Sequence, residues 1–338
     1  MYRRIVYWLM TDYEIKDGVG IIPEGTTIIE RVFNRDLTSI VIPDSVTKIG
    51  EKAFEGCTGL TSIHIPASVE SLSWYPHSIF YGCKNLKSIK VAEGNPVYDS
   101  RDNCNAIIET ETNKLVVGSA TTVIPATVVE IGNFAFKHVN IAEIFIHEGI
   151  KKIGDFAFEL TGVNRIRVAE GNTVYDSRGD CNAIIETETN SLVLGCSKSI
   201  IPDTVTKINS FAFSGCSDLK EIVIPDSVTE IDSWAFNNSG LKSVVIGKKV
   251  KYIGEKAFER CESLEAITFR GPAPKMEKNY LGVEDAFKYC KSVKVINVPV
   301  GKYSIYARRL YRGNFSDFWN PWEGLLVEVP VEKKASKK

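Results

Sequence analysis

The feature that most constrains this chain is a short pattern that returns along most of its length. The pattern I-P-x-[ST]-V-x-x-I is followed by A-F-x-x-C-x-x-L-x-x-I, and its clearest copy begins at Ile42. Pro43 and Pro66 lie 23 residues apart, as do Pro202 and Pro225. A period in this range predicts a solenoid, because one repeat is too small to bury its own apolar face and must stack on its neighbours.

Each repeat is predicted to supply one short strand to a parallel sheet. In the segment 60–65, alternation places Ile63 and Ile65 on one side of the strand and His64 on the other. Proline follows most of these segments and ends the ladder, because it has no amide proton. We expect nine such strands in one long sheet, with inward-facing pairs at Ile40/Ile42, Ile63/Ile65, Ile89/Val91, Ile144/Ile146, Ile166/Val168, Ile222/Ile224, Val244/Ile246, Ile267/Phe269 and Ile296/Val298.

Two nearly identical inserts, at 92–122 and 169–199, interrupt the array. The segments 91–118 and 168–195 match at 23 of 28 positions, which indicates duplication of a larger block. Each insert reads as a three-stranded β-meander, and we expect both to protrude as flaps at one rim of the solenoid. Calcium binding by the acidic turn of the first insert is not expected, because Gly179 replaces Asp102 in the second copy.

Composition excludes several classes of protein. The chain has 41 basic and 42 acidic residues and a net charge of −1, so we expect neither nucleic-acid binding nor membrane insertion. Five of the eight cysteines, at 57, 83, 216, 261 and 290, occupy one small slot of the repeat, which indicates buried free thiols. No C-x-x-C pair is present, so no metal site is expected.

The ends of the array are predicted to be capped. We assign 1–20 to an N-terminal cap, 21–298 to a solenoid of about nine repeats, 299–332 to a small α/β C-terminal cap, and 333–338 to a disordered basic tail. The apolar run at 5–10 is shorter than a secretory signal requires. The chain as written therefore carries no export signal and is expected to be cytoplasmic.

The full pattern, I-x-I-P-x-[ST]-V-x-x-I-G-x-x-A-F-x-x-C-x-x-L, resembles the BspA-like leucine-rich repeats. The resemblance covers residues 20–300 and extends to a closing segment that begins at Val298. It implies a curved, mainly-β solenoid with the parallel sheet on its concave side. It also implies binding rather than catalysis, often as a bacterial surface adhesin. A cell-surface or secreted location would follow if a leader is missing.

No catalytic constellation is apparent in the sequence, and no cofactor is expected. The four histidines lie in different repeats, and no phosphate-binding, nucleophile-elbow or dinucleotide motif is present. The candidate binding face is instead the outward column of the main strands, although valine also suits an exposed pleat for structural reasons alone. We predict partner contacts from this column at His64, Lys90, Phe145, Arg167, Val223 and Val245.

Four aromatic residues are predicted as secondary contacts: Trp74, Tyr75, Tyr98 and Tyr175. Trp74 and Tyr75 lie in a repeat that is three residues longer than its neighbours, where they could equally seal the flank of the first insert. The leading hypothesis is a monomeric, non-catalytic scaffold for an unidentified protein partner. The alternatives are a self-associating structural spacer and, third, a carbohydrate-binding protein.

Overall fold

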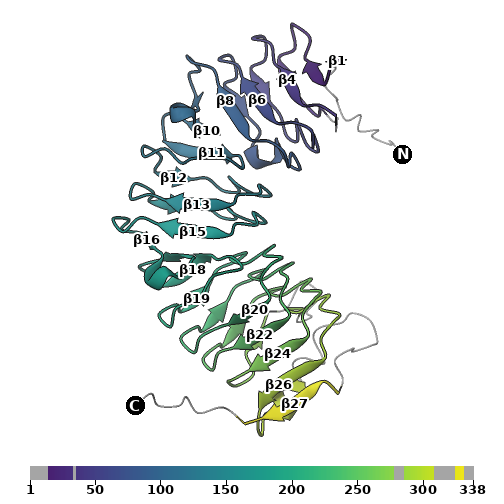
Figure 1. The fold of residues 1–338 in the computed structure, drawn as a ribbon, viewed down its shortest axis with the longest axis vertical. Helices are drawn as coiled ribbons and strands as arrows, with labels where there is room; N and C mark the ends of the chain where they lie inside the picture. Colours follow the sequence, from purple (N-terminus) through teal and green to yellow (C-terminus); the bar gives the residue numbers. More distant parts are fainter. Residues whose placement is uncertain (1–13, 33–35, 278–284, 308–323, 331–338) are drawn as a thin grey trace, which may run out of the picture. The chain divides into compact units, whose positions relative to one another are not determined.

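The computed structural model describes residues 14–32, 36–277, 285–307 and 324–330, and these form a mainly-β solenoid. Each repeat makes one coil, with a main strand on one side and a shorter return strand on the other. Figure 1 labels these strands along the chain. Much of the two expected caps, and the whole basic tail at 333–338, lie outside the described residues.

Nine of the eleven main strands coincide with the predicted segments, β2 and β27 being additional, and the predicted inward residues are buried except Val168, which is half-buried. The pairs β2–β4, β6–β8, β20–β22, β22–β24, β24–β26 and β26–β27 are parallel, and an additional strand, β1 (Glu14–Lys16), pairs antiparallel with β2. They form separate sheets, β1-β2-β4, β6-β8, β13-β15 and β20-β22-β24-β26-β27, rather than the single sheet that we expected. The main strands are β2 (Val19–Ile21), β4 (Ser39–Val41), β6 (Ser62–Ile65), β8 (Ser88–Val91), β13 (Glu143–Ile146), β15 (Arg165–Val168), β20 (Glu221–Val223), β22 (Ser243–Ile246), β24 (Ala266–Phe269), β26 (Val295–Pro299) and β27 (Leu326–Val329).

The return strands are two residues long and also pair in parallel. The second residue of each is apolar, most often isoleucine, and is buried except in β14, where Ile153 is half-buried; the residue before it is exposed or half-buried. They are β3 (Ile28–Ile29), β5 (Lys48–Ile49), β7 (Ser71–Leu72), β12 (Glu130–Ile131), β14 (Lys152–Ile153), β19 (Lys207–Ile208), β21 (Glu230–Ile231), β23 (Tyr252–Ile253) and β25 (Lys275–Met276). A short 3₁₀ helix, η1 (Pro76–Ser78), lies in the longer third coil.

Both inserts contain the expected antiparallel meander, but they are joined to the solenoid more closely than a flap would be. The last strand of each meander pairs in parallel with the next return strand, β11 with β12 and β18 with β19. The meander therefore widens the return sheet. The elements are β9 (Tyr98–Asp99), η2 (Arg101–Asn103), β10 (Ala106–Glu109) and β11 (Lys114–Gly118), and then β16 (Tyr175–Asp176), η3 (Arg178–Asp180), β17 (Ile184–Glu186) and β18 (Ser191–Leu194).

The phenylalanines of most Ala-Phe pairs stack on the equivalent ring of a neighbouring coil. Phe213, Phe236, Phe258 and Phe287 form one column with ring centroids 4.8–4.9 Å apart and interplanar angles of 1–5°. Phe136 stacks on Phe158 in the same way, at 5.4 Å. These offset contacts add to the burial of each ring, so the core is shared between coils.

The cysteine slot has a specific role in this stacking. The Cys83, Cys261 and Cys290 thiols each donate a hydrogen bond to the backbone carbonyl of a core phenylalanine in an earlier coil. The sulfur–oxygen distances are 3.0–3.2 Å. Burial raises the pKa of the Cys83 thiol to about 12, so the thiol stays protonated and remains a donor at neutral pH. The eight cysteines are free, as the repeat pattern predicted.

The chain divides into two compact units, which we describe separately. Unit 1 comprises Met1–Ala142 and Ile146–Thr161, and unit 2 comprises Glu143–Phe145 and Gly162–Lys338. One continuous core in unit 2 extends from Cys181 to Leu326. At its far end Tyr306 is fully buried, lies 4.8 Å from the Phe269 ring and donates a hydrogen bond to the Gly271 carbonyl. Tyr306 therefore contributes to closing the core at this end.

No helix among the described residues has the length and apolar character needed to cross a bilayer.

Candidate functional site

The outward column of the main strands is exposed, as the alternation of the strands requires. Phe145 and Val223 retain 46% and 52% of their accessible surface, and His64 and Lys90 are also exposed. Val245 is half-buried. Apolar side chains at such exposure do not stabilise the core, so they are free to contact a partner.

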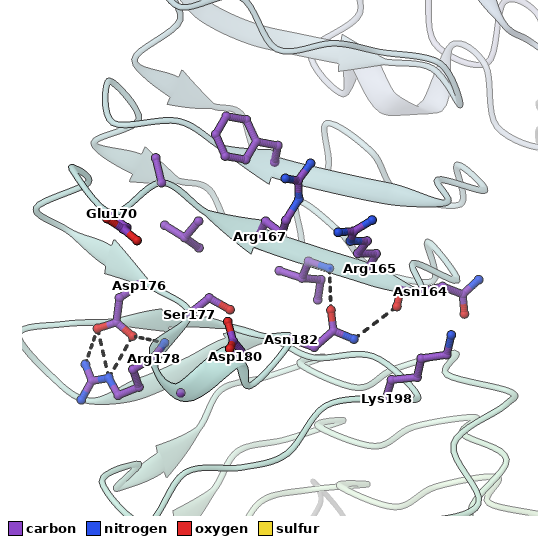
Figure 2. A pocket seen from close by; sticks show the side chains of 15 residues that line it. Asn164, Arg165, Arg167, Glu170, Asp176, Ser177, Arg178, Asp180, Asn182 and Lys198 are labelled. Carbon is purple, nitrogen blue, oxygen red and sulfur yellow. Dashed lines mark hydrogen bonds and ion pairs between the residues drawn. The ribbon is translucent and has the colours of Figure 1, made fainter.

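A recess of about 870 Å³ lies beside the second insert in unit 2 (Figure 2). One side is formed by Phe145 of β13 and by Arg165 and Arg167 of β15. The other is formed by the end of β16 and by η3, including Asp176 and Arg178. The insert thus converts an open strand face into a walled site, because β16 and η3 follow β15 after only a short turn.

Phe145 and Arg167 are neighbours across the β13–β15 pair. The Arg167 guanidinium lies 5.5 Å from the centroid of the Phe145 ring, which is cation–π distance. Its Nη2 and Nε atoms lie 2.6 and 2.7 Å from Oε1 of Glu143, which also lies 3.8 Å from Nε of Arg165. Such exposed ion pairs contribute only about 0–1 kcal/mol each, so a carboxylate of a partner can replace Glu143 at little cost.

The opposite wall is held by Arg178. Its Nε donates to Oδ1 of Asp176 at 2.8 Å, and its Nη1 donates to Oδ1 of Asn190 at 2.7 Å and to Oγ1 of Thr204 at 3.3 Å. The hydrogen bond to Asp176, followed by the charge of that carboxylate, raises the pKa of the guanidinium. Arg178 thereby joins η3, the β17–β18 turn and the next coil.

Replacing Arg178 with methionine is expected to lower the free energy of unfolding by about 1–2 kcal/mol, because three acceptors lose a common donor. Urea denaturation of the purified chain measures this change. Arg165→Met is the matched control, since Arg165 has only the 3.8 Å contact with Glu143 and its loss should change stability by less than about 0.5 kcal/mol. Equal effects of the two substitutions would contradict the role given to Arg178.

Charges without an ion-pair partner in the described part of the chain remain on the rim of this recess. They are Lys198, Glu170 and Asp180, and all three side chains are exposed. Ile166 lies lower in the recess, and its amide donates to Oδ1 of Asn182 at 2.7 Å. An apolar ring beside a cation, within a rim of mixed charge, is the composition of many protein interfaces.

The first insert forms an equivalent recess of about 500 Å³ in unit 1. Lys90 occupies the position of Arg167, and His64 lies on the preceding main strand. Arg101 repeats the arrangement of Arg178, donating to Asp99, to Oδ1 of Asn113 at 2.7 Å and to Oγ1 of Thr127 at 3.2 Å. Burial alone would raise the pKa of Asp99, but hydrogen bonds from Arg101 outweigh burial and lower it.

The four predicted secondary contacts have different environments. Trp74 is 90% exposed and Tyr75 is also exposed, but neither lines the recesses described above. Tyr98 is half-buried and lines the smaller recess. The prediction for Tyr175 was wrong, because its side chain, on the first strand of the second meander, is only 4% exposed.

Two exposed members of the outward column were missed. Val123 and Ile200, at equivalent positions after the two meanders, retain 73% and 72% of their accessible surface. Each directly precedes an Ile-Pro pair, as Val41 and Val223 do. That signal was available in the sequence, but Val123 and Ile200, which directly follow the inserts at 92–122 and 169–199, were not included in the predicted outward column.

Three of the histidines are half-buried or buried, and they line neither recess. Burial lowers the pKa of His77 to about 4, and burial also lowers the pKa of His138 and His147. Within the described ranges, no group of three or more His, Cys, Asp or Glu side chains is placed to hold a metal ion.

The sequence matches the family described as BspA type leucine rich repeat region, in six copies, over residues 25–114, 117–179 and 184–316. No curated protein matches the sequence. Among solved structures, the chain is similar to a leucine rich cell surface protein from Faecalibacterium prausnitzii, with 21% identity, 96% of each chain covered and a TM-score of 0.54. It is also similar to a leucine-rich repeat protein from Eubacterium ventriosum, with 19% identity, 84% and 81% of the two chains covered and a TM-score of 0.54.

Proposed function

Because the chain belongs to the BspA-type leucine-rich repeat family, we propose that it is a non-catalytic scaffold that binds a protein partner through the outward column and the two recesses. The observation that carries the proposal is the larger recess, where Phe145 and Arg167 are exposed and adjacent beside a rigid second wall. Aromatic and arginine side chains in such surroundings account for a large share of binding energy in known interfaces.

Both recesses support a role in partner binding, but the larger one offers the stronger set of contact residues. Their insert walls are nearly identical, but the strand wall of the larger recess presents Phe145 and Arg167 where the smaller presents His64 and Lys90. We therefore propose that the larger recess is the principal contact. The similar structure from Faecalibacterium prausnitzii is that of a cell surface protein. We therefore propose that this chain recognises its partner at a bacterial surface.

The test is the double substitution Phe145→Asp plus Arg167→Glu. Proteins captured by the immobilised parent chain are identified and purified, and their affinity is then measured against both chains. We expect the double variant to bind at least about thirtyfold more weakly, because one substitution removes the apolar anchor and the other reverses the charge beside it.

The matched control is Val300→Asp plus Lys302→Glu, which makes the same change of charge at two exposed positions in the same unit. It should bind as the parent does. Equal affinity of the recess variant and the control would exclude Phe145 and Arg167 from the binding surface. Thermal melting by circular dichroism confirms that both variants remain folded.

Self-association as a structural spacer is the competing function, and the exposed aliphatic residues Val123 and Ile200 favour it. If the chain self-associates, its molar mass measured by light scattering rises with protein concentration in the absence of any ligand. A constant monomer mass would contradict it. Carbohydrate binding stays a weaker prediction, because neither recess is lined by Trp74 or Tyr75.

A further inference from the structure

A second kind of recess lies on the return side of unit 2, among residues that the proposed protein interface does not use. Its volume is about 420 Å³. We call it the lysine recess, and it is lined by Thr229, Lys248, Lys249, Val250, Lys251, Pro272, Ala273 and Lys275. Its apolar lining includes the buried Val250 and the half-buried Ala273, and its polar lining is almost entirely cationic.

The positive charge of the lysine recess is poorly compensated. Lys248 lies 3.7 Å from Asp226, whereas Lys249, Lys251 and Lys275 are exposed and form no ion pair with any described residue. The nearby acids make their hydrogen bonds with other residues, although the charge of Glu277 also acts on Lys275. Oε2 of Glu277 accepts hydrogen bonds from Oγ of Ser233 at 3.0 Å and from the amide of Glu255 at 2.9 Å.

The remaining nearby acid is also occupied. Glu230 lies 3.5 Å from Nζ of Lys207, which is in turn 3.0 Å from Asp232. Lys249 and Lys251 therefore remain without a counter-charge among the described residues, on a partly apolar surface in a chain whose net charge is −1, whereas Lys275 has the charge of Glu277 nearby. Low-dielectric walls lined by one sign of charge focus the local potential and attract ions of the opposite sign.

The array itself shows that the fold does not require these lysines. Asp226, Ser227 and Thr229 occupy the equivalent turn of the preceding coil. Both turns have the same backbone hydrogen bonds. The amide of Val228 donates to the carbonyl of Pro225, and the amide of Val250 donates to the carbonyl of Gly247. The amides of Thr229 and Lys251 each donate, at 2.8 Å, to a carbonyl of the preceding coil. An acidic and two hydroxyl side chains suffice for this turn, so the exchange to three lysines changes charge without changing structure.

We propose that the lysine recess binds a flexible polymer that carries sulfate or phosphate groups. The ammonium group of lysine is a compact point charge that pairs with tetrahedral oxyanions without requiring planar geometry. The recess has no aromatic lining on which nucleobases could stack, which disfavours nucleic acid as the polymer. Neighbouring oxyanions along one polymer can engage Lys249, Lys251 and Lys275 together.

The test measures binding of fluorescent dextran sulfate and of inorganic polyphosphate by anisotropy, at several salt concentrations, with uncharged dextran as the blank. The key variant is Lys249→Ser plus Lys251→Thr, which copies the preceding coil and therefore folds. We expect it to bind about tenfold more weakly at low salt, with the slope of log K against log salt reduced by about 1 to 2.

The matched control, Lys242→Ser plus Lys291→Thr, removes two exposed lysines elsewhere in unit 2 and should change affinity less than twofold. Preference for dextran sulfate or for polyphosphate identifies the source of the oxyanion. Equal effects of the two variants, or equally tight binding of polyglutamate, would overturn the proposal. Phe145→Asp plus Arg167→Glu should leave polyanion binding intact, so this inference and the proposed function can fail separately.

Discussion

Replacing Phe236 with alanine is expected to lower the free energy of unfolding of unit 2 by about 3–5 kcal/mol. Phe236 is fully buried, and its ring lies 4.9 Å from the rings of both Phe213 and Phe258. The substitution removes two stacking contacts and leaves a cavity that spans the shared interior of three coils. Urea denaturation followed by circular dichroism measures the loss.

The matched control is Phe145→Ala, the same chemical change at an exposed phenylalanine of the same unit. It should lower stability by less than about 1 kcal/mol, because most of the ring is already outside the core. A similar cost at the two positions would mean that the stacked column does not hold the coils together. The unfolding transition should remain single, since one core extends from Cys181 to Leu326.

The fold was largely predictable because one pattern is repeated many times. The alternation around Ile63 and Ile65 fixed the inward face of each main strand, and the Ala-Phe slot correctly predicted a buried ring in every clear repeat. Each repeat indicates the same strand and the same buried positions, so an error in assigning one repeat does not change the predicted fold. A family resemblance carried by the same residues then led to the correct architecture.

The inserts were less predictable for a physical reason. The sequence correctly indicated three short antiparallel strands, but strand partners outside a segment depend on hydrogen bonds that no local pattern specifies. The parallel pairing of Leu115 with Ile131 and of Leu192 with Ile208 joins each meander to the return sheet.

The candidate site was predicted in part. Alternation placed Phe145 and Arg167 on the outward face, and both are there. The recess that they share with Asp176 and Arg178 could not be inferred, because it depends on how the turn after β15 brings η3 back towards the strand. Tyr175 was misassigned because the same turn directs its side chain into the interior.

The second large effect is expected for Gly195→Ala, which should lower the free energy of unfolding by about 3 kcal/mol. A Cβ atom at Gly195 would lie 2.1 Å from Cε1 of Phe213 and 2.3 Å from its Cζ. The glycine cannot retreat, because its amide donates to the Ala212 carbonyl at 2.8 Å, and the ring cannot move without leaving the Phe236 stack. Gly118 meets Phe136 in the same way at 2.0 Å, so Gly118→Ala should have a similar effect in unit 1.

A double-mutant cycle separates this steric cause from any other effect of alanine. Phe213→Leu removes the ring atoms that the new Cβ would meet, although it carries its own cost in the core. We expect Gly195→Ala plus Phe213→Leu to be more stable than the sum of the single effects by at least about 1 kcal/mol, as measured by urea denaturation. Additive effects would contradict the idea that each duplicated insert ends in glycine because the phenylalanine of the next coil occupies the space of a side chain.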